Sequence, residues 1–222
     1  ARGTAWAQDE LVRTRRLELR GATAHAMPAR VLAVLGCACL ERLMWIFAYG
    51  SLIFRPSFTF IEKRRAYVKG WARRFWQGSP DHRGVPGAPG RVVTLVPNSD
   101  EACGGCAYRI DPHLAPEIFA ALDIREQASF VRRSLALHGE PHERAFAEGI
   151  TWVAGEANEH FLGPMPERDI AAYIRGRSGP SGTNADYALR LLDALRALEI
   201  VDAHVEEIGR HLADDGALDA QR

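Results

Sequence analysis

The sequence lacks an excess of charge of either sign, since its 222 residues include 28 Lys and Arg and 28 Asp and Glu. Proteins that bind nucleic acid without sequence preference use a surplus of basic residues to neutralise phosphates, and this chain has no surplus. It also contains no apolar run near the roughly 20 residues that a membrane-spanning helix needs, and no internal repeat. With 47% hydrophobic residues, the composition predicts a single soluble globular protein in the cytoplasm, with neither a nucleic-acid nor a membrane partner.

Cysteine is scarce, and the four residues form two close pairs, Cys37 with Cys39 and Cys103 with Cys106. Such pairs invite a zinc or redox interpretation. The second pair, however, lies in a segment with the pattern of a strand, where a buried small thiol explains Cys106. An even number of cysteines does not argue for disulfides in a chain with a core this large. We therefore expect no metal site.

A β-like apolar run begins at Trp45 and stops at Tyr49-Gly50-Ser51-Leu52. Aromatic and β-branched residues favour a strand, and Gly50 allows a sharp exit where a small molecule can approach the main chain. We expect a ligand at this turn of exposed backbone amides, with an ordinary strand-to-loop corner as the alternative. Ser51 is not expected to be a nucleophile, because the Gly-x-Ser-x-Gly elbow of serine hydrolases and its acid and His are lacking.

A second motif, from Trp71 to Ser79, reads Trp-Ala-Arg-Arg-Phe-Trp-Gln-Gly-Ser. Its interleaved arginines and aromatic residues resemble nucleic-acid surfaces, an alternative that the balanced net charge disfavours. A strand would send Arg73 and Arg74 to opposite faces, which suits one inward anion contact and one solvated charge. His82 follows in a loop rich in Pro and Gly, and we interpret it as a structural or hydrogen-bonding residue.

These motifs, with two later ones in the same order, closely resemble the hallmark segments of the ChaC-like γ-glutamylcyclotransferases. The resemblance extends from about Trp45 to about Leu198. Four ordered motifs are far more specific than any one of them. The segments are Tyr49-Gly50-Ser51-Leu52, Arg73-Arg74-Phe75-Trp76-Gln77-Gly78-Ser79, Leu122-Asp123-Ile124-Arg125-Glu126 and Gly179-Pro180-Ser181-Gly182-Thr183-Asn184-Ala185-Asp186-Tyr187.

The resemblance implies a lyase that cleaves glutathione to 5-oxoproline and Cys-Gly without water or a cofactor. The γ-glutamyl α-amine attacks its own γ-carbonyl, and a five-membered-ring geometry can supply effective molarities on the order of 10⁵ to 10⁸ M. One carboxyl near both nitrogens can remove a proton from the attacking amine and return it to the leaving amine. We expect a monomer or a weak homodimer. The alternatives are a cyclotransferase for another γ-glutamyl amine or amino acid, and a non-catalytic nucleic-acid or ligand-binding protein.

Glu126 matches the catalytic carboxylate of the family, and it follows the apolar pattern of an amphipathic helix. The alternative is a solvated surface carboxylate beside Arg125. As a base at neutral pH, Glu126 could work unshifted or with a pKa modestly raised by partial burial. The sequence departs from the family after this residue, because Gln127-Ala128-Ser129-Phe130 stands where Lys-Gly-Gly-Tyr is common. This change bears on the flexibility of the loop and on the fit of the cysteinyl-glycine end.

The resemblance also predicts the residues that bind the substrate: Tyr49, Gly50, Ser51, Leu52, Arg73 and Tyr187. The turn would hold the γ-glutamyl head, with backbone amides and the Ser51 hydroxyl available to the α-carboxylate or the developing oxyanion. Tyr187 shares a helix face with several leucines, so a core role is an equal alternative for it.

The order of elements, several strands before several helices, predicts an α+β fold. The family implies a small mixed β-barrel surrounded by helices. Thr183-x-x-Asp186 predicts the start of one helix through a variant of the capping box. The expected strands are 45–49, 67–76, 91–96, 104–110, 130–137 and 146–154, and the expected helices are 112–124, 167–176, 184–199 and 201–213.

Residues 1–44 lie outside the resemblance, and residues 45–222 are expected to form the γ-glutamylcyclotransferase domain. The preferred interpretation of the first segment is an upstream extension of the reading frame. A signal segment and an N-terminal helix that packs on the barrel are the alternatives. The tail from Asp202 onward alternates acidic and apolar residues and predicts a solvated terminal helix.

Overall fold

The fold is built around a closed mixed β-barrel, seen in a computed structural model that describes residues 44–126 and 130–219. Around the barrel the strands follow the order β1-β3-β2-β4-β5. All neighbours pair antiparallel except β1 and β5, which pair in parallel. The α+β barrel implied by the resemblance is thereby confirmed. Its strands are β1 (Met44–Ala48), β2 (Glu62–Ser79), β3 (Gly90–Ile110), β4 (Val131–His138) and β5 (Ala145–Val153).

The two longest strands, β2 and β3, form one hairpin closed by residues 80–89. The prediction of separate strands over 91–96 and 104–110 is wrong, because the backbone stays extended between them. The pairing passes from Lys69 opposite Ala102 to Trp71 opposite Pro97, so the polar residues 98–101 bulge out opposite Gly70. Gly70 has a φ of 78°, a conformation that suits glycine at a bulge. The polar run therefore marks an irregularity within the strand and does not end it.

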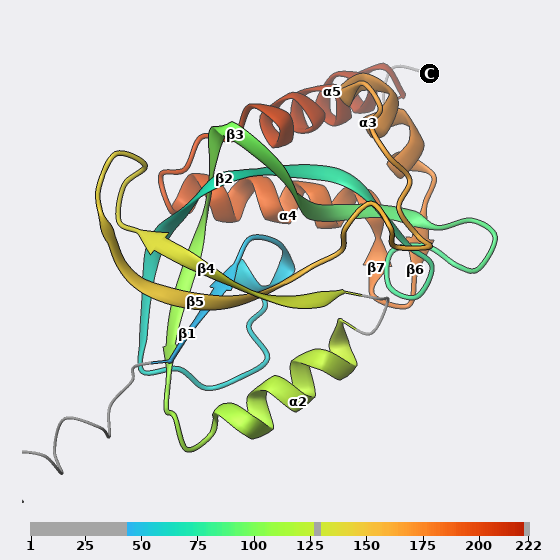
Figure 1. Ribbon diagram of the computed structural model, residues 1–222. Coiled ribbons are helices and arrows are strands. Elements are labelled where there is room, and N and C mark those ends of the chain that lie inside the picture. Colours follow the sequence, from blue (N-terminus) through green and yellow to red (C-terminus); the bar gives the residue numbers. More distant parts are fainter. Residues whose placement is uncertain (1–43, 127–129, 220–222) are drawn as a thin grey trace, which may run out of the picture. The chain divides into compact units, whose positions relative to one another are not determined.

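Three helices lie together on one side of the barrel, and α2 lies on the other side beside β4 and β5 (Figure 1). All four predicted helices are present, with ends shifted by a few residues. The Thr183 hydroxyl accepts a hydrogen bond from the Asp186 N–H at 3.2 Å, which confirms the predicted cap of α4. The helices are α2 (Ala115–Arg125), α3 (Glu167–Arg175), α4 (Asn184–Ala197) and α5 (Ala203–Asp219).

The last helix, α5, belongs to the core, so the prediction of a solvated tail is wrong for its first part. Val205, Ile208 and Leu212 are all buried. They recur at helical spacing and give α5 an apolar face, and α5 packs against α3 and α4. Of the acidic residues that suggested a solvated segment, Glu206 and Glu207 are partly exposed and Asp214 is exposed.

Short segments join these elements at one end of the barrel. A single 3-10 turn, η1 (Ser51–Ile53), follows β1, and a small hairpin of β6 (Ser178–Gly179) and β7 (Gly182–Thr183) leads into α4. A Cβ at Gly179 would lie 2.5 Å from the carbonyl oxygens of His82 and Gly84, so only glycine lets this hairpin approach the loop after β2. Both segments contribute to the cavity described below.

Within the described ranges, no helix is long and apolar enough to cross a membrane. The expectations for residues 1–43, including Cys37 and Cys39, fall outside the described residues, as do those for residues 127–129 and 220–222. The division into an extension and a catalytic domain stays a prediction.

Candidate active site

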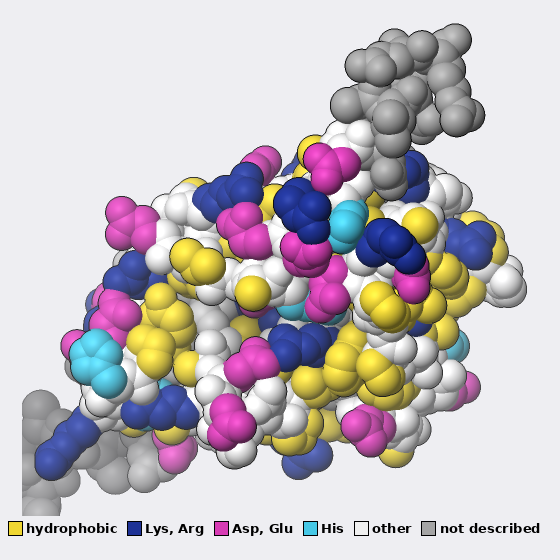
Figure 2. Space-filling view, turned by 90° about the horizontal axis from the view of Figure 1, so that it is seen from above, with side chains coloured by type: hydrophobic (Ala, Val, Ile, Leu, Met, Phe, Trp, Pro, Cys, Tyr) yellow, Lys and Arg dark blue, Asp and Glu magenta, His cyan; other side chains and the backbone are white. Residues whose placement is uncertain are grey.

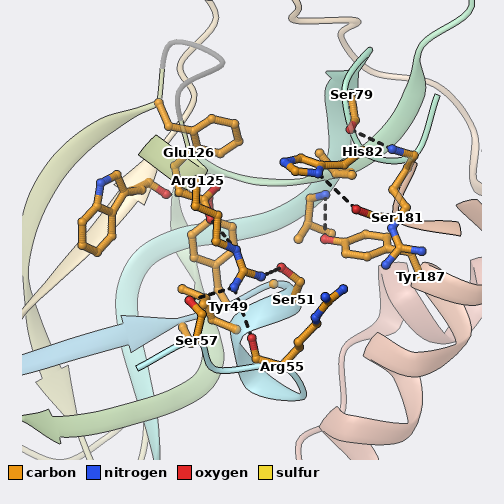
Figure 3. Close-up of a pocket in the computed structure, with 18 of the residues that line it drawn as sticks. Tyr49, Ser51, Arg55, Ser57, Ser79, His82, Arg125, Glu126, Ser181 and Tyr187 are labelled. Carbon is orange, nitrogen blue, oxygen red and sulfur yellow. Dashed lines mark hydrogen bonds and ion pairs between the residues drawn. The ribbon is translucent and has the colours of Figure 1, made fainter. Parts of the chain in front are cut away.

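A cavity of about 340 Å³ opens at the end of β1, within the range typical of small-molecule sites. Its walls come from the turn after β1, the loop after β2, the end of α2, the strand β5 and the start of α4 (Figure 3). Six of the seven predicted site residues line it, namely Tyr49, Gly50, Ser51, Leu52, Glu126 and Tyr187. The seventh, Arg73, does not.

The turn after β1 forms one wall, and its shape depends on close packing at Gly50. The φ of Gly50 is −124°, so this position does not require the left-handed conformation. A Cβ there would instead lie 3.1 Å from the Val93 Cγ2 atom and 3.3 Å from the Tyr187 hydroxyl oxygen. The conformational freedom inferred from the sequence is thus less important than the space that the missing side chain leaves. The Ile53 N–H donates to the Gly50 carbonyl at 3.0 Å, whereas the N–H groups of Ser51 and Leu52 come too early in the turn to have an acceptor inside it.

The Tyr49 side chain lies in the same wall and is fixed by the barrel. Its hydroxyl donates a hydrogen bond to the carbonyl of Trp152 at 2.7 Å. Burial, reinforced by the negative charge of Glu126, raises the pKa of Tyr49 well above its ordinary value. Tyr49 is therefore neutral, and its hydroxyl proton is used in the hydrogen bond to Trp152. Its ring forms part of the apolar wall of the cavity.

Glu126 is the residue that ends α2, where its N–H donates to the Leu122 carbonyl at 2.8 Å. Its side chain is only 21% exposed, so it is a partly buried carboxylate on the cavity wall and not a solvated surface group. Burial raises its pKa, while the nearby Arg125, and to a smaller extent His82, oppose that rise. With a raised pKa, Glu126 takes up a proton more readily than an ordinary surface Glu does.

Arg125 connects Glu126 to the turn after β1, a role that was not predicted for it (Figure 3). Its Nη2 donates to the Ser51 hydroxyl at 2.9 Å, and its Nη1 donates to the Ser57 hydroxyl at 3.1 Å and the Arg55 carbonyl at 3.3 Å. Its Nε lies 3.6 Å from a carboxylate oxygen of Glu126. One side chain therefore holds the end of α2 against the turn. The only sequence signal was its position beside Glu126.

Arg73 lies behind the turn, where the structure does not bring it to the cavity. It is 1% exposed, and its Nε donates to the Tyr49 carbonyl at 2.7 Å. Its other nitrogens donate to Asp202 Oδ2 at 2.7 Å and to the Gly104 carbonyl. Arg74 points the other way, so the predicted opposite faces are confirmed, and the inward contact of Arg73 with an anion is present. The prediction of a solvated charge is wrong, because the Arg74 side chain is only 19% exposed and pairs with Glu101. The anion that Arg73 contacts is the carboxylate of Asp202.

Tyr187 combines the two roles that its sequence position left open. Its side chain is 4% exposed and packs against the rings of Phe54 and Phe75, with centroids 6.3 and 5.8 Å away. It also lines the cavity, where its hydroxyl accepts a hydrogen bond from the Val93 N–H at 3.4 Å. Burial raises the pKa of this phenol to about 12, so it is neutral at physiological pH.

His82 reaches the cavity from the loop after β2, in the hydrogen-bonding role predicted for it. Its Nδ1 lies 3.1 Å from the Ser181 hydroxyl and its Nε2 lies 3.8 Å from Asp81. The Ser181 N–H also donates to the His82 carbonyl at 3.0 Å, which ties the loop to the β6-β7 hairpin.

Several cavity residues were not predicted, because they lie outside the motifs or at motif positions to which no role was assigned. What they share is a polar side chain that the fold brings to the same walls. They are Arg55, Ser79, Asp81, Arg83, Arg125 and Ser181.

The described cysteines, Cys103 and Cys106, are buried free thiols. Burial raises the pKa of Cys103 to about 11, which disfavours the thiolate that zinc requires. Among the residues that the structure describes, no group of three or more His, Cys, Asp or Glu side chains is placed to hold a metal ion.

Comparisons with known proteins agree with this geometry. A relative from Arabidopsis thaliana, named γ-glutamylcyclotransferase 2-3, is 38% identical over 181 residues, covering 78% of this chain and 91% of the relative. The Homo sapiens glutathione-specific γ-glutamylcyclotransferase 1 is 36% identical over 155 residues, covering 69% of this chain and 70% of the relative. A crystal structure of the yeast γ-glutamylcyclotransferase specific to glutathione superposes with a TM-score of 0.70 at 27% identity, covering 78% of this chain and 98% of that one. The model of the ChaC-like protein family matches residues 44–214. The chain therefore belongs to the ChaC-like protein family.

Proposed function

We propose that this protein is a glutathione-specific γ-glutamylcyclotransferase that converts glutathione to 5-oxoproline and Cys-Gly. The observation that carries the proposal is the placement of Glu126 and the turn after β1 in one cavity, joined by Arg125. A carboxylate with a raised pKa beside a turn of available N–H groups suits a reaction that moves one proton between two nitrogens of a bound amide. The names of the relatives agree with this chemistry.

In the proposed reaction, the cavity holds the γ-glutamyl group folded, with its α-amine against its own γ-carbonyl. Glu126 removes a proton from the amine as the five-membered ring forms. It then gives the proton to the nitrogen of the cysteine residue as the amide bond breaks. The fold contributes mainly by fixing the reacting atoms, which can be worth effective molarities on the order of 10⁵ to 10⁸ M.

The Ser51 hydroxyl is suited to donate to the substrate. Its oxygen accepts a hydrogen bond from Arg125, so its own proton is free to point towards a carboxylate or a developing oxyanion in the cavity. Backbone N–H groups of the same turn would add to this stabilisation. Arg73 would act from behind, because it holds the carbonyl of Tyr49 and hence the start of the turn.

A role in nucleic-acid binding is less well supported by the surface charges. Three of the six Lys and Arg side chains of β2 have acidic partners, since Arg65 pairs with Glu140, Arg73 with Asp202 and Arg74 with Glu101. Figure 2 shows Lys and Arg interspersed with Asp and Glu over the face that carries α3 and α5. Such interspersed charge does not favour a phosphate backbone. The compartment and the oligomeric state stay predictions.

The test is incubation of the purified protein with millimolar glutathione, following 5-oxoproline and Cys-Gly by mass spectrometry. We expect both products to appear together in wild type. In Glu126→Gln the rate should fall by about 10² to 10⁴, the usual contribution of a general acid-base group. The matched control is Glu156→Gln, which removes an exposed carboxylate outside the cavity and should change nothing.

The pH dependence gives a second readout of the same group. Because the pKa of Glu126 is raised, wild-type activity should fall with acid at a higher pH than an ordinary Glu would give. A wild-type protein inert towards glutathione would contradict the proposal, and γ-glutamyl amino acids would then be the next substrates to test. Full activity in Glu126→Gln would remove Glu126 from the mechanism but leave the substrate in place.

A further inference from the structure

The cavity contains more positive than negative charge. Three guanidinium groups line it, those of Arg55, Arg83 and Arg125, against the carboxylates of Asp81 and Glu126. Glutathione at neutral pH has the opposite balance, with two carboxylates and one ammonium group. The cavity and the proposed substrate are therefore complementary in net charge. A guanidinium that is free of partners within the protein is the one best suited to bind a carboxylate of the substrate.

Two of the three guanidinium groups are engaged within the protein. Arg125 donates three hydrogen bonds to the turn and the segment after it. Arg83 is 6% exposed, donates to the Thr183 carbonyl at 3.1 Å and lies 3.7 Å from Asp186. Its guanidinium also lies over the Tyr187 ring, 5.2 Å from the centroid. Both groups are held in place by these partners.

The guanidinium of Arg55 differs from these two. Among the described residues, no hydrogen bond or ion pair engages this guanidinium. Only the backbone of Arg55 is used: its N–H donates to the Ser51 carbonyl at 2.8 Å, and its carbonyl accepts a hydrogen bond from Arg125. Figure 3 shows the side chain extending from the segment after η1 into the space between Ser51 and Tyr187. An arginine with five unused N–H donors at the wall of a cavity is well suited to bind a carboxylate through two parallel hydrogen bonds.

We propose that the Arg55 guanidinium binds a carboxylate of the γ-glutamyl peptide substrate. This inference rests on the proposed function. Two carboxylates of glutathione could be the partner, the one on the glycine and the one on the γ-glutamyl α-carbon. Both present the same two oxygens to a guanidinium, so the experiment is built to tell them apart.

The experiment compares wild type, Arg55→Gln and Arg55→Lys on three substrates. The first is glutathione, the second is glutathione with its glycine carboxylate amidated, and the third is 4-aminobutyryl-Cys-Gly, which lacks only the α-carboxylate. With glutathione, Arg55→Gln should lower kcat/KM by about ten- to a hundred-fold, mainly through KM, because the interaction does not involve the reacting atoms. Arg55→Lys should lower kcat/KM by a smaller factor, since lysine keeps the positive charge but cannot donate two parallel hydrogen bonds to one carboxylate.

The analogue that lacks the partner carboxylate should be a poor substrate for wild type and should be insensitive to Arg55→Gln. If that analogue is the amide, Arg55 binds the glycine carboxylate. If it is the 4-aminobutyryl peptide, Arg55 binds the α-carboxylate. The matched control is Arg168→Gln, which removes a guanidinium that is 78% exposed on α3 and should leave all three substrates unaffected.

The inference is overturned if Arg55→Gln has unchanged kinetics on glutathione, or if it loses the same factor on all three substrates. Thermal unfolding of each variant would show that the fold is intact, as expected for an exposed side chain. Failure of the inference is distinct from failure of the proposed function. In the first case wild type still makes 5-oxoproline from glutathione, whereas in the second it makes none, and the role of Arg55 falls with it.

Discussion

The turn after β1 separates two polar regions that use similar residues in opposite ways. In front of it lies the cavity, where the guanidinium of Arg55 has no partner among the described residues and Glu126 has only a cation at 3.6 Å. Behind it lies the rear network, which consists of Arg73, Asp202 and His204. The polar atoms of these side chains are hydrogen-bonded to neighbouring side chains and backbone groups. A charged group with its partners inside the protein holds structure together, whereas one with unused capacity beside a cavity is available to a ligand.

The rear network ties three elements together through His204. The Phe75 N–H in β2 donates to the Nε2 atom of His204 at 3.0 Å, so the ring proton must be on Nδ1. The Nδ1 atom lies 2.8 Å from a carboxylate oxygen of Glu167 in α3. Because His204 belongs to α5, this one ring links both helices to the strand that also holds Arg73. In the front region, Arg125 joins the end of α2 to the turn, and His82 joins the loop after β2 to the β6-β7 hairpin.

The largest loss of stability is expected from Arg73→Met. Removing one partner of a buried ion pair leaves Asp202 and the Tyr49 and Gly104 carbonyls without their donor, which should cost about 3 to 5 kcal/mol of unfolding free energy. Urea denaturation measures this loss. Arg74→Met is the matched control, because that partly exposed pair with Glu101 should cost about 1 kcal/mol or less. Equal losses of unfolding free energy in both variants would mean that the buried ion pair of Arg73 stabilises the fold no more than the partly exposed pair of Arg74.

The next test uses the pH dependence of stability. Burial lowers the pKa of His204 below the 6.5 of an unperturbed ring. The unfolded chain therefore takes up a proton before the folded one does, and stability is lost as the pH falls from about 6.5 through the lower, folded value. Each unit of difference is worth about 1.4 kcal/mol. Urea unfolding at pH values on both sides of this window measures the loss.

His204→Gln should flatten the stability curve over this window. The exposed His113, which lies outside the network, supplies the control variant His113→Gln. Glu167 adds a loss at lower pH, because its bond to His204 lowers its pKa. If the stability of His204→Gln still falls with pH over this window as in wild type, another group causes the pH dependence.

The smallest effect is expected where the two regions meet, at Tyr187. Tyr187→Phe keeps the ring packing against Phe54 and Phe75 and removes a hydroxyl that makes only a long hydrogen bond. Stability should change by about 1 kcal/mol or less. If the hydroxyl contacts the substrate, kcat/KM for glutathione should fall about ten-fold, whereas an unchanged value would assign Tyr187 to the core alone. Thermal unfolding and steady-state kinetics on the same samples separate the two.

Local patterns predicted the elements and the motifs well. The apolar run before Tyr49, the helical spacing before Glu126 and the cap at Thr183 depend on neighbours in sequence, and all three segments have the expected conformation. The strand break near residue 98 was wrong, because pairing with β2 on both sides keeps a polar segment extended. The solvated tail was wrong because the apolar face of α5 becomes buried only when α3 and α4 are present.

Local sequence was enough to predict the order of strands and helices and the family that the motifs resemble, and that resemblance predicted Glu126 as the catalytic carboxylate. Which polar side chains share the cavity depends on the tertiary structure. Arg73 stands in the most recognisable motif yet faces Asp202, whereas Arg55 and Arg125 stand in no basic cluster yet reach the cavity. The physical reason is that a charge acts over a few ångströms in space, and barrel closure brings together residues that are distant in the chain.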